Sequence, residues 1–77
     1  MTTTIQINNL NPKTAKRIVQ LCNEYELTAD VKRGNIRVDA RSIMGVMGLI
    51  GHDVDIVIFD EMSSDIMNMI DELRQCE

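Results

Sequence analysis

The order in which two hydrophobic periodicities follow one another most restricts what this chain can fold into. Apolar residues alternate with polar ones, as in half-buried strands, in residues 2–7, 27–31, 36–38 and 54–58. They recur at helical spacing in residues 12–25 and 64–73, and residues 42–49 indicate a short helix. The order β-α-β-β-α-β-α predicts an α+β fold, with a four-stranded antiparallel sheet and three helices on one face.

Local signals mark where several of these elements begin. Asn11 is a good helix N-cap, and Pro12 suits the first helical position, where its missing N–H costs nothing. Gly34, within an Arg-Gly-Asn sequence, predicts a tight hairpin turn with a positive φ. Ser42 is expected to cap the short second helix, and Ser64 to cap the last one.

Length and composition restrict the class of protein. The 77 residues predict one domain, residues 1–77, with a core of just adequate size. A net charge of −4 and an aromatic content of 3% argue against a nucleic-acid partner. Because no apolar run approaches a membrane span and the first residues do not resemble a signal peptide, we expect a cytoplasmic protein without membrane contact.

Neither the cysteines nor the acidic residues form a recognisable metal or cofactor site. Cys22 is expected in the core and Cys76 near the surface, both as reduced thiols. A single histidine, His52, leaves no Cys/His zinc set of usual spacing. The acidic residues near the third helix do not fit a calcium loop and are expected to be solvated: Asp53, Asp55, Asp60, Glu61 and Asp65.

Residues 38–49, with the unusual string Ser-Ile-Met-Gly-Val-Met at Ser42–Met47, resemble the regulatory-serine segment of the HPr family. These are the small phosphocarriers of sugar phosphotransferase systems, and the order of elements is similar over essentially the whole chain. The resemblance implies an HPr-like open-faced β-sandwich. It also implies that Ser42 is phosphorylated by an ATP-dependent HPr kinase/phosphorylase-like enzyme. The phosphorylated protein would then bind a transcription factor of carbon catabolite control.

The residues after Ser42 are the expected contact surface for such a partner. Ile43, Met44 and Met47 would form a small exposed apolar patch, and methionine suits an adaptable docking surface. Two alternatives stay open from the pattern alone. The serine can be a helix cap with no further role, and the apolar residues can belong to the core.

The resemblance breaks at the start of the first helix. The family pattern there is Gly-x-His-Ala-Arg-Pro, and ungapped counting from Ser42 places Asn9, Asn11, Lys13 and Thr14 at its glycine, histidine, arginine and proline. An amide nitrogen is delocalised into its carbonyl and is a very poor nucleophile, so Asn11 is not expected to carry a phosphoryl group. His52, beside an acidic residue, is expected to be exposed and non-catalytic.

Three functions therefore compete, and none of them is an enzyme. The first is a regulatory HPr-like protein that contacts partners through the patch and through Lys13 and Arg17, with phosphotransferase components among the possible partners. The second is an interaction module without phosphorylation, in which a dimer or a permanent partner covers the patch. The third is a working phosphocarrier, against which Asn11 argues. We expect a monomer or a weak homodimer.

Overall fold

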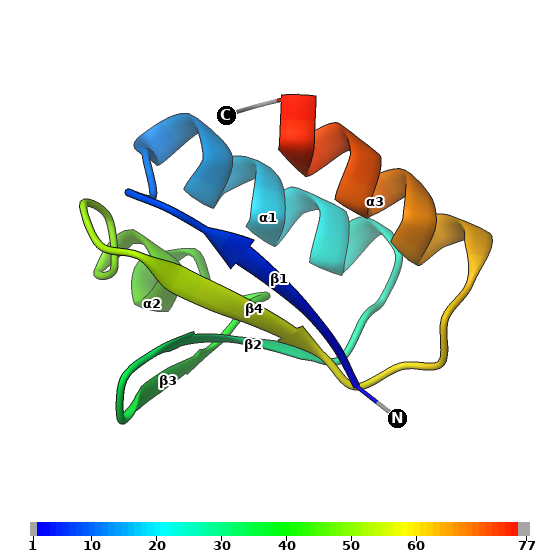
Figure 1. Cartoon of the computed structure of the whole chain (residues 1–77), viewed down its shortest axis with the longest axis horizontal. Helices are drawn as coiled ribbons and strands as arrows, with labels where there is room; N and C mark the ends of the chain where they lie inside the picture. Colours follow the sequence, from blue (N-terminus) through cyan, green and yellow to red (C-terminus); the bar gives the residue numbers. More distant parts are fainter. Residues whose placement is uncertain (1, 76–77) are drawn as a thin grey trace.

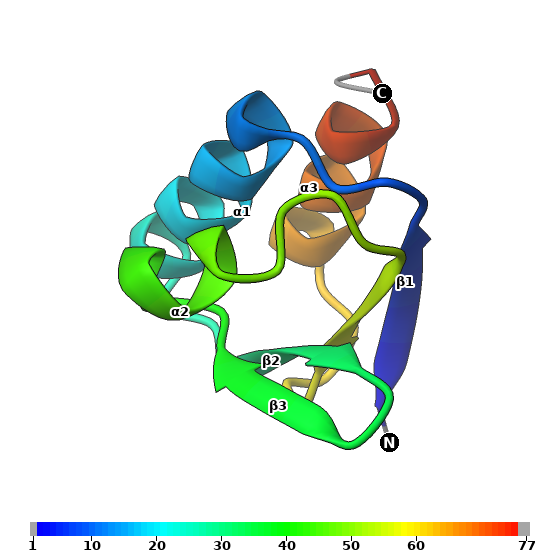
Figure 2. The ribbon, with the colours of Figure 1, turned by 90° about the vertical axis from the view of Figure 1, so that its left-hand side faces the viewer.

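The computed structural model describes residues 2–75 and confirms the predicted order of elements (Figure 1). The strands and helices follow as β1 (Thr3–Ile7), α1 (Pro12–Glu24), β2 (Ala29–Arg33), β3 (Ile36–Asp39), α2 (Ile43–Met47), β4 (Val54–Ile58) and α3 (Ser64–Gln75). The sheet has the order β1-β4-β2-β3, and every neighbouring pair is antiparallel. The three helices lie on one side of this sheet and leave its other face uncovered (Figure 2).

The strand register collects the apolar side chains on the helical side of the sheet. Ile56 of the central strand β4 pairs with Ile5 of β1 on one side and with Val31 of β2 on the other. Ile56 and Val31 are completely buried, and Ile5 packs against the core. Because successive side chains of a strand point to opposite faces, one alternating pattern supplies both the core and the polar outer face.

Helix α1 begins and packs as its sequence predicts. Asn11 is its N-cap, in extended conformation, and Pro12 is its first residue. Ile18 and Cys22 are fully buried. Burial, aided by the nearby Asp39 carboxylate, raises the pKa of the Cys22 thiol to about 11, so this thiol is protonated and unreactive near neutral pH. Cys76 lies outside the described residues.

The predicted cap of α3 was wrong by one residue. Ser63 accepts the Ile66 N–H with its Oγ at 3.3 Å and the Met67 N–H with its carbonyl at 3.1 Å. Ser64 is instead the first residue of the helix. Two adjacent serines offer equivalent caps, and the choice between them depends on how the buried stripe of α3 meets the sheet.

Two of the acidic residues that were expected to be solvated also accept main-chain hydrogen bonds. The Asp53 carboxylate accepts the Asn9 N–H at 2.8 Å, and the Asp60 carboxylate accepts the Thr28 N–H at 2.6 Å. Both carboxylates lie just outside the ends of β4. The N–H groups that they accept belong to neighbouring loops and have no partner in the sheet.

Among residues 2–75, no helix combines the length and hydrophobicity that crossing a bilayer requires. The same residues contain no group of three or more potential metal-binding side chains.

Candidate functional site

The start of α1 is held in place by main-chain hydrogen bonds to the loop between α2 and β4. The Leu10 N–H donates to the His52 carbonyl at 2.9 Å, and the Gly51 N–H donates to the Leu10 carbonyl at 2.7 Å. Leu10 is buried, whereas Asn11 and His52 are exposed. Asn11 occupies the position of the histidine in the HPr pattern. The backbone hydrogen bonds of Leu10 therefore hold position 11 at the surface, and they do not involve the side chain at that position.

Asn11 uses its side chain as a helix cap. Its Oδ1 accepts the Thr14 N–H at 2.8 Å. Beside it lies a shallow pocket lined by Ile7, Asn8, Asn9, Asn11 and Thr14. Thr14 is 1% exposed, and its Oγ1 has no hydrogen-bond partner among the described residues. Where the HPr pattern has an apolar proline, this chain thus has Thr14, whose buried hydroxyl forms no hydrogen bond with the surrounding described residues.

Asn9 adopts a backbone conformation that few residues tolerate. Its φ is +50°, in the left-handed region, and its N–H is bonded to Asp53. Asparagine occupies this region more readily than other non-glycine residues, and β-branched residues are strongly disfavoured there. This explains why asparagine can stand where the HPr pattern has glycine.

We expect Asn9→Val to lower the free energy of unfolding by about 1–2 kcal/mol, because valine is strained at positive φ. Asn9→Gly is the matched control and should change that free energy by less than about 1 kcal/mol. Urea unfolding followed by far-ultraviolet circular dichroism measures both. Equal stabilities of the two variants would contradict the strained conformation.

Ser42 lies at the start of α2 in the geometry of an N-cap. Its Oγ accepts the Gly45 N–H at 3.4 Å, and its carbonyl accepts the Val46 N–H at 3.0 Å. The residue is exposed, so a second protein can reach its hydroxyl. Gly45 allows α2 to lie close to β3, because a Cβ at this position would lie 3.1 Å from the Cβ of Val38.

The apolar residues that follow Ser42 form the predicted exposed patch. Met44 is 84% exposed, and Ile43 and Met47 are each 42% exposed. Of the five residues of α2, only Val46 is buried in the core. The alternative interpretation, in which Ile43, Met44 and Met47 belong to the core, is therefore wrong.

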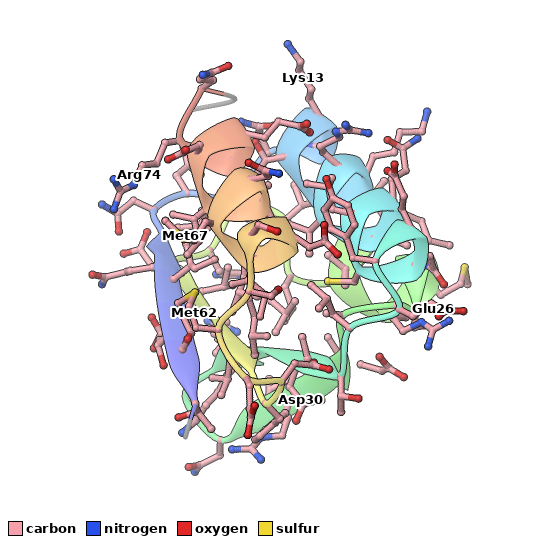
Figure 3. The ribbon with its side chains drawn as sticks, turned by 90° about the vertical axis from the view of Figure 1, so that its right-hand side faces the viewer. Lys13, Glu26, Asp30, Met62, Met67 and Arg74 are labelled. Atoms are coloured by element: carbon pink, nitrogen blue, oxygen red, sulfur yellow. The ribbon has the colours of Figure 1, made fainter. Side chains whose placement is uncertain are left out.

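A shallow groove joins α2 to the start of α1. It is lined by Pro12, Lys13, Lys16, Ile43 and Met47. The structure thus brings Lys13 together with two of the predicted contact residues, and Figure 3 shows Lys13 extending outward from the start of α1. Pro12 was expected only to begin the helix. Its spacing of four residues from Lys16 was the available signal that it faces the same groove, because residues i and i+4 of a helix lie on one face.

Arg17 lies elsewhere on α1. Its Nε donates to the Glu72 carboxylate of α3, and its Nη1 donates to Gln20 Oε1 at 3.2 Å. The hydrogen bond from Arg17 lowers the pKa of Glu72. Arg17 is not among the residues that line the groove, so the structure does not unite it with Lys13 and the patch.

The fold and the two surface positions at Asn11 and Ser42 define a small α+β protein of open-faced sandwich type, with an exposed serine at one helix start and an amide at another. The family model described as "PTS HPr component phosphorylation site" matches residues 2–75, and the chain belongs to the HPr family. HPr proteins are phosphocarriers rather than catalytic enzymes, and they interact with other proteins of the phosphotransferase system.

Two solved structures have the same fold. HPr-C-His from Thermoanaerobacter tengcongensis is 25% identical with a TM-score of 0.67, and the match covers 95% of this chain and 89% of that chain. The phosphocarrier protein HPr from Bacillus anthracis str. Ames is 22% identical with a TM-score of 0.64, and the match covers 94% and 92% of the two chains. A comparison with curated proteins finds no match.

Proposed function

We propose that this HPr-family protein is a cytoplasmic regulator that is phosphorylated on Ser42, binds partner proteins in carbon catabolite control, and does not relay phosphoryl groups. The observation that supports this proposal is that the N-cap residues of α2 and of α1 differ in chemistry. At α2 an exposed serine stands beside exposed apolar side chains, and at α1 the nucleophile position holds Asn11.

A phosphate on Ser42 would be favourably placed. The first N–H groups of a helix lack partners within the helix, and negative charge near them is stabilised. Phosphorylation adds between one and two negative charges beside Ile43 and Met47, which line the groove. The modification would therefore change the charge of the contact surface without rebuilding it.

Asn11 is unsuited to phosphoryl transfer for two reasons. Its amide nitrogen is not nucleophilic, and its oxygen is engaged with the Thr14 N–H. Lys13 keeps a positive charge at the arginine position but lacks the planar fork that binds an anion through two hydrogen bonds. The start of α1 would then contribute to partner binding and not to chemistry.

The groove indicates the chemistry of the partner. Two lysines, Lys13 and Lys16, flank the apolar side chains of Ile43 and Met47. An apolar side chain with neighbouring carboxylates would satisfy both features. An HPr kinase/phosphorylase-like enzyme, a catabolite-control transcription factor and phosphotransferase components are the protein classes that we propose as partners.

We expect the purified protein to gain one phosphate when it is incubated with an HPr kinase and ATP, and Ser42→Ala to lose this gain completely. Intact-mass spectrometry measures the added phosphate. Ser63→Ala is the matched control, because Ser63 is also a helix cap whose Oγ accepts an N–H, here from Ile66. A wild-type protein that stays unmodified, under conditions that label an ordinary HPr, would contradict the proposal.

A second candidate is an HPr-fold interaction module that needs no phosphorylation. The apolar groove favours it, because Ile43 and Met47 are exposed in the unmodified chain. In that case Ser42→Ala would bind the transcription factor as tightly as wild type, whether or not kinase and ATP are present. Tighter binding by the phosphorylated wild type alone would favour the regulator.

A further inference from the structure

The side chain of Asn23, in the last turn of α1, contacts the residue that precedes Ser42. Its Nδ2 donates to the Arg41 carbonyl at 3.3 Å, and its Oδ1 accepts the Arg41 Nε–H at 3.2 Å. The same Nδ2 donates to the Val19 carbonyl at 2.8 Å, which fixes the amide on its own helix. One asparagine therefore ties both the main chain and the guanidinium of Arg41 to α1, which lies beside α2 (Figure 2).

The main chain around Arg41 is also held by Asp39, at the end of β3. Asp39 Oδ1 accepts the Arg41 N–H at 2.9 Å, and the Asp39 carbonyl accepts the Ser42 N–H at 3.0 Å. Ala40, between Asp39 and Arg41, is buried and donates its N–H to the Ala29 carbonyl at 3.0 Å. Because the N–H and the carbonyl of Arg41 are both bonded, the segment that leads to Ser42 has a fixed course.

The Arg41 guanidinium has N–H donors that no other group uses. Among residues 2–75 it forms no ion pair, and its hydrogen bond is the Nε–H contact with the neutral amide of Asn23. Its side chain is exposed, and its two Nη groups remain for another acceptor. The planar fork of a guanidinium matches the oxygens of a phosphate. Arg41 is thus a cation available to a phosphate on the next residue.

We propose that Arg41 is the intramolecular partner of a phosphate on Ser42, and that phosphorylation draws its guanidinium from Asn23 to the phosphate oxygens. The inference deepens the proposed function and rests on Ser42 as the modified residue. In the modification, a bond forms between Ser42 Oγ and the γ-phosphorus of ATP. The bond from that phosphorus to the bridging oxygen breaks, ADP leaves, and the hydroxyl proton is released.

The exchange of partners is favourable because the two contacts of the guanidinium differ in charge. The contact with Asn23 joins a cation to a neutral amide at an exposed surface. The contact with a phosphate joins opposite charges and can use two parallel N–H donors. Consecutive Cα atoms lie about 3.8 Å apart, so rotations of the Arg41 side chain bring the guanidinium to the phosphate. The bonded main chain of Arg41 need not move.

Phosphorylation would then change the surface in two ways. Arg41 would neutralise part of the added charge and hold the phosphate in one direction beside Ile43, so a partner protein would meet a phosphate of fixed position. Asn23 would lose its bond to the guanidinium and keep its bonds to the carbonyls of Val19 and Arg41. The segment before Ser42 would keep its course, and only the Arg41 side chain would differ between the two states.

Phosphoserine incorporated at position 42 during translation tests the inference without depending on a kinase. The second pKa of this phosphoserine is measured by phosphorus NMR at low ionic strength. A neighbouring cation favours the doubly charged phosphate and lowers that pKa. We therefore expect Arg41→Gln to raise the pKa by at least about 0.3. Arg41→Lys, which keeps the charge but not the fork, should raise it by less than about half as much.

Arg33→Gln is the matched control, because it makes the same change in net charge at a distance from Ser42. Arg33 pairs with Ile36 at the start of β3, whereas Ser42 follows the end of that strand. Solvent and salt screen exposed charges over such a separation, so this variant should change the phosphoserine pKa by less than about 0.1.

The Arg41 Nε–H signal in nitrogen–proton NMR spectra provides the second measurement. It should shift between the unmodified protein and the protein with phosphoserine at position 42, because the acceptor changes from Asn23 Oδ1 to a phosphate oxygen. An unshifted signal, or an equal phosphoserine pKa in wild type and Arg41→Gln, would overturn the inference. Incubation of the unmodified chain with an HPr kinase and ATP tests the proposed function separately, so the two can fail independently.

Discussion

Asn11→His is expected to turn the chain into a phosphoryl acceptor. Incubated with phosphoenolpyruvate and the general phosphotransferase component, the variant should gain acid-labile label at least about tenfold above the wild-type background, because an imidazole nitrogen supplies the missing nucleophile. The scaffold around position 11 is ready for it. The position is exposed, and Leu10 is bonded on both sides to the Gly51–His52 loop.

The replacement should also carry a cost in stability. Asn11 caps α1 through the Thr14 N–H, and loss of a cap typically lowers the free energy of unfolding by about 0.5–2 kcal/mol. Asn11→Ala is the matched control, because it removes the cap without adding a nucleophile and should gain no label. Wild-type protein that is labelled as strongly as Asn11→His would refute our account of Asn11 and revive the phosphocarrier interpretation.

Leu73→Ala should destabilise the whole domain. Leu73 is fully buried in α3, beside Ile66 and Met69. Truncating a buried leucine to alanine typically costs about 2–5 kcal/mol, through lost transfer free energy and the cavity that remains. A domain of this size has a free energy of unfolding of only about 5–10 kcal/mol, so the variant should be partly unfolded in mild denaturant.

Asn68→Ala, on the exposed side of the same helix, provides the comparison for Leu73→Ala. It should change the free energy of unfolding by less than about 0.5 kcal/mol. Urea titrations of both variants at a low protein concentration, where self-association is negligible, measure the difference. A loss below about 1 kcal/mol for Leu73→Ala would show that α3 does not pack as described.

The sequence predicted the elements and the fold because the hydrophobic period changes at almost every boundary. It also predicted the hairpin, and Gly34 has the positive φ that the turn requires. The cap of α3 was misplaced because Ser63 and Ser64 carry the same side chain, and only packing against the sheet distinguishes them.

The arrangement of basic residues on α1 was harder to predict. At about 100° per residue, Lys16 and Arg17 lie on opposite sides of Lys13 around the helix axis. The sequence cannot show which side meets α2 and which meets α3. In the structure Lys16 lies in the groove with Ile43, whereas Arg17 pairs with Glu72 of α3. The partner helices, and not the pattern on α1, decide which residues join the candidate site.

The hydrogen bonds of Leu10 bear on which side chains position 11 can accept. The N–H and the carbonyl of Leu10 are both bonded to the loop before β4, so the residue that follows it is held at the surface whatever its side chain. Codons for asparagine and histidine differ in a single base. A scaffold that fixes position 11 through its neighbour thus keeps the histidine of the family pattern one point mutation away, and we expect that single base change to place an imidazole at the surface without refolding the protein.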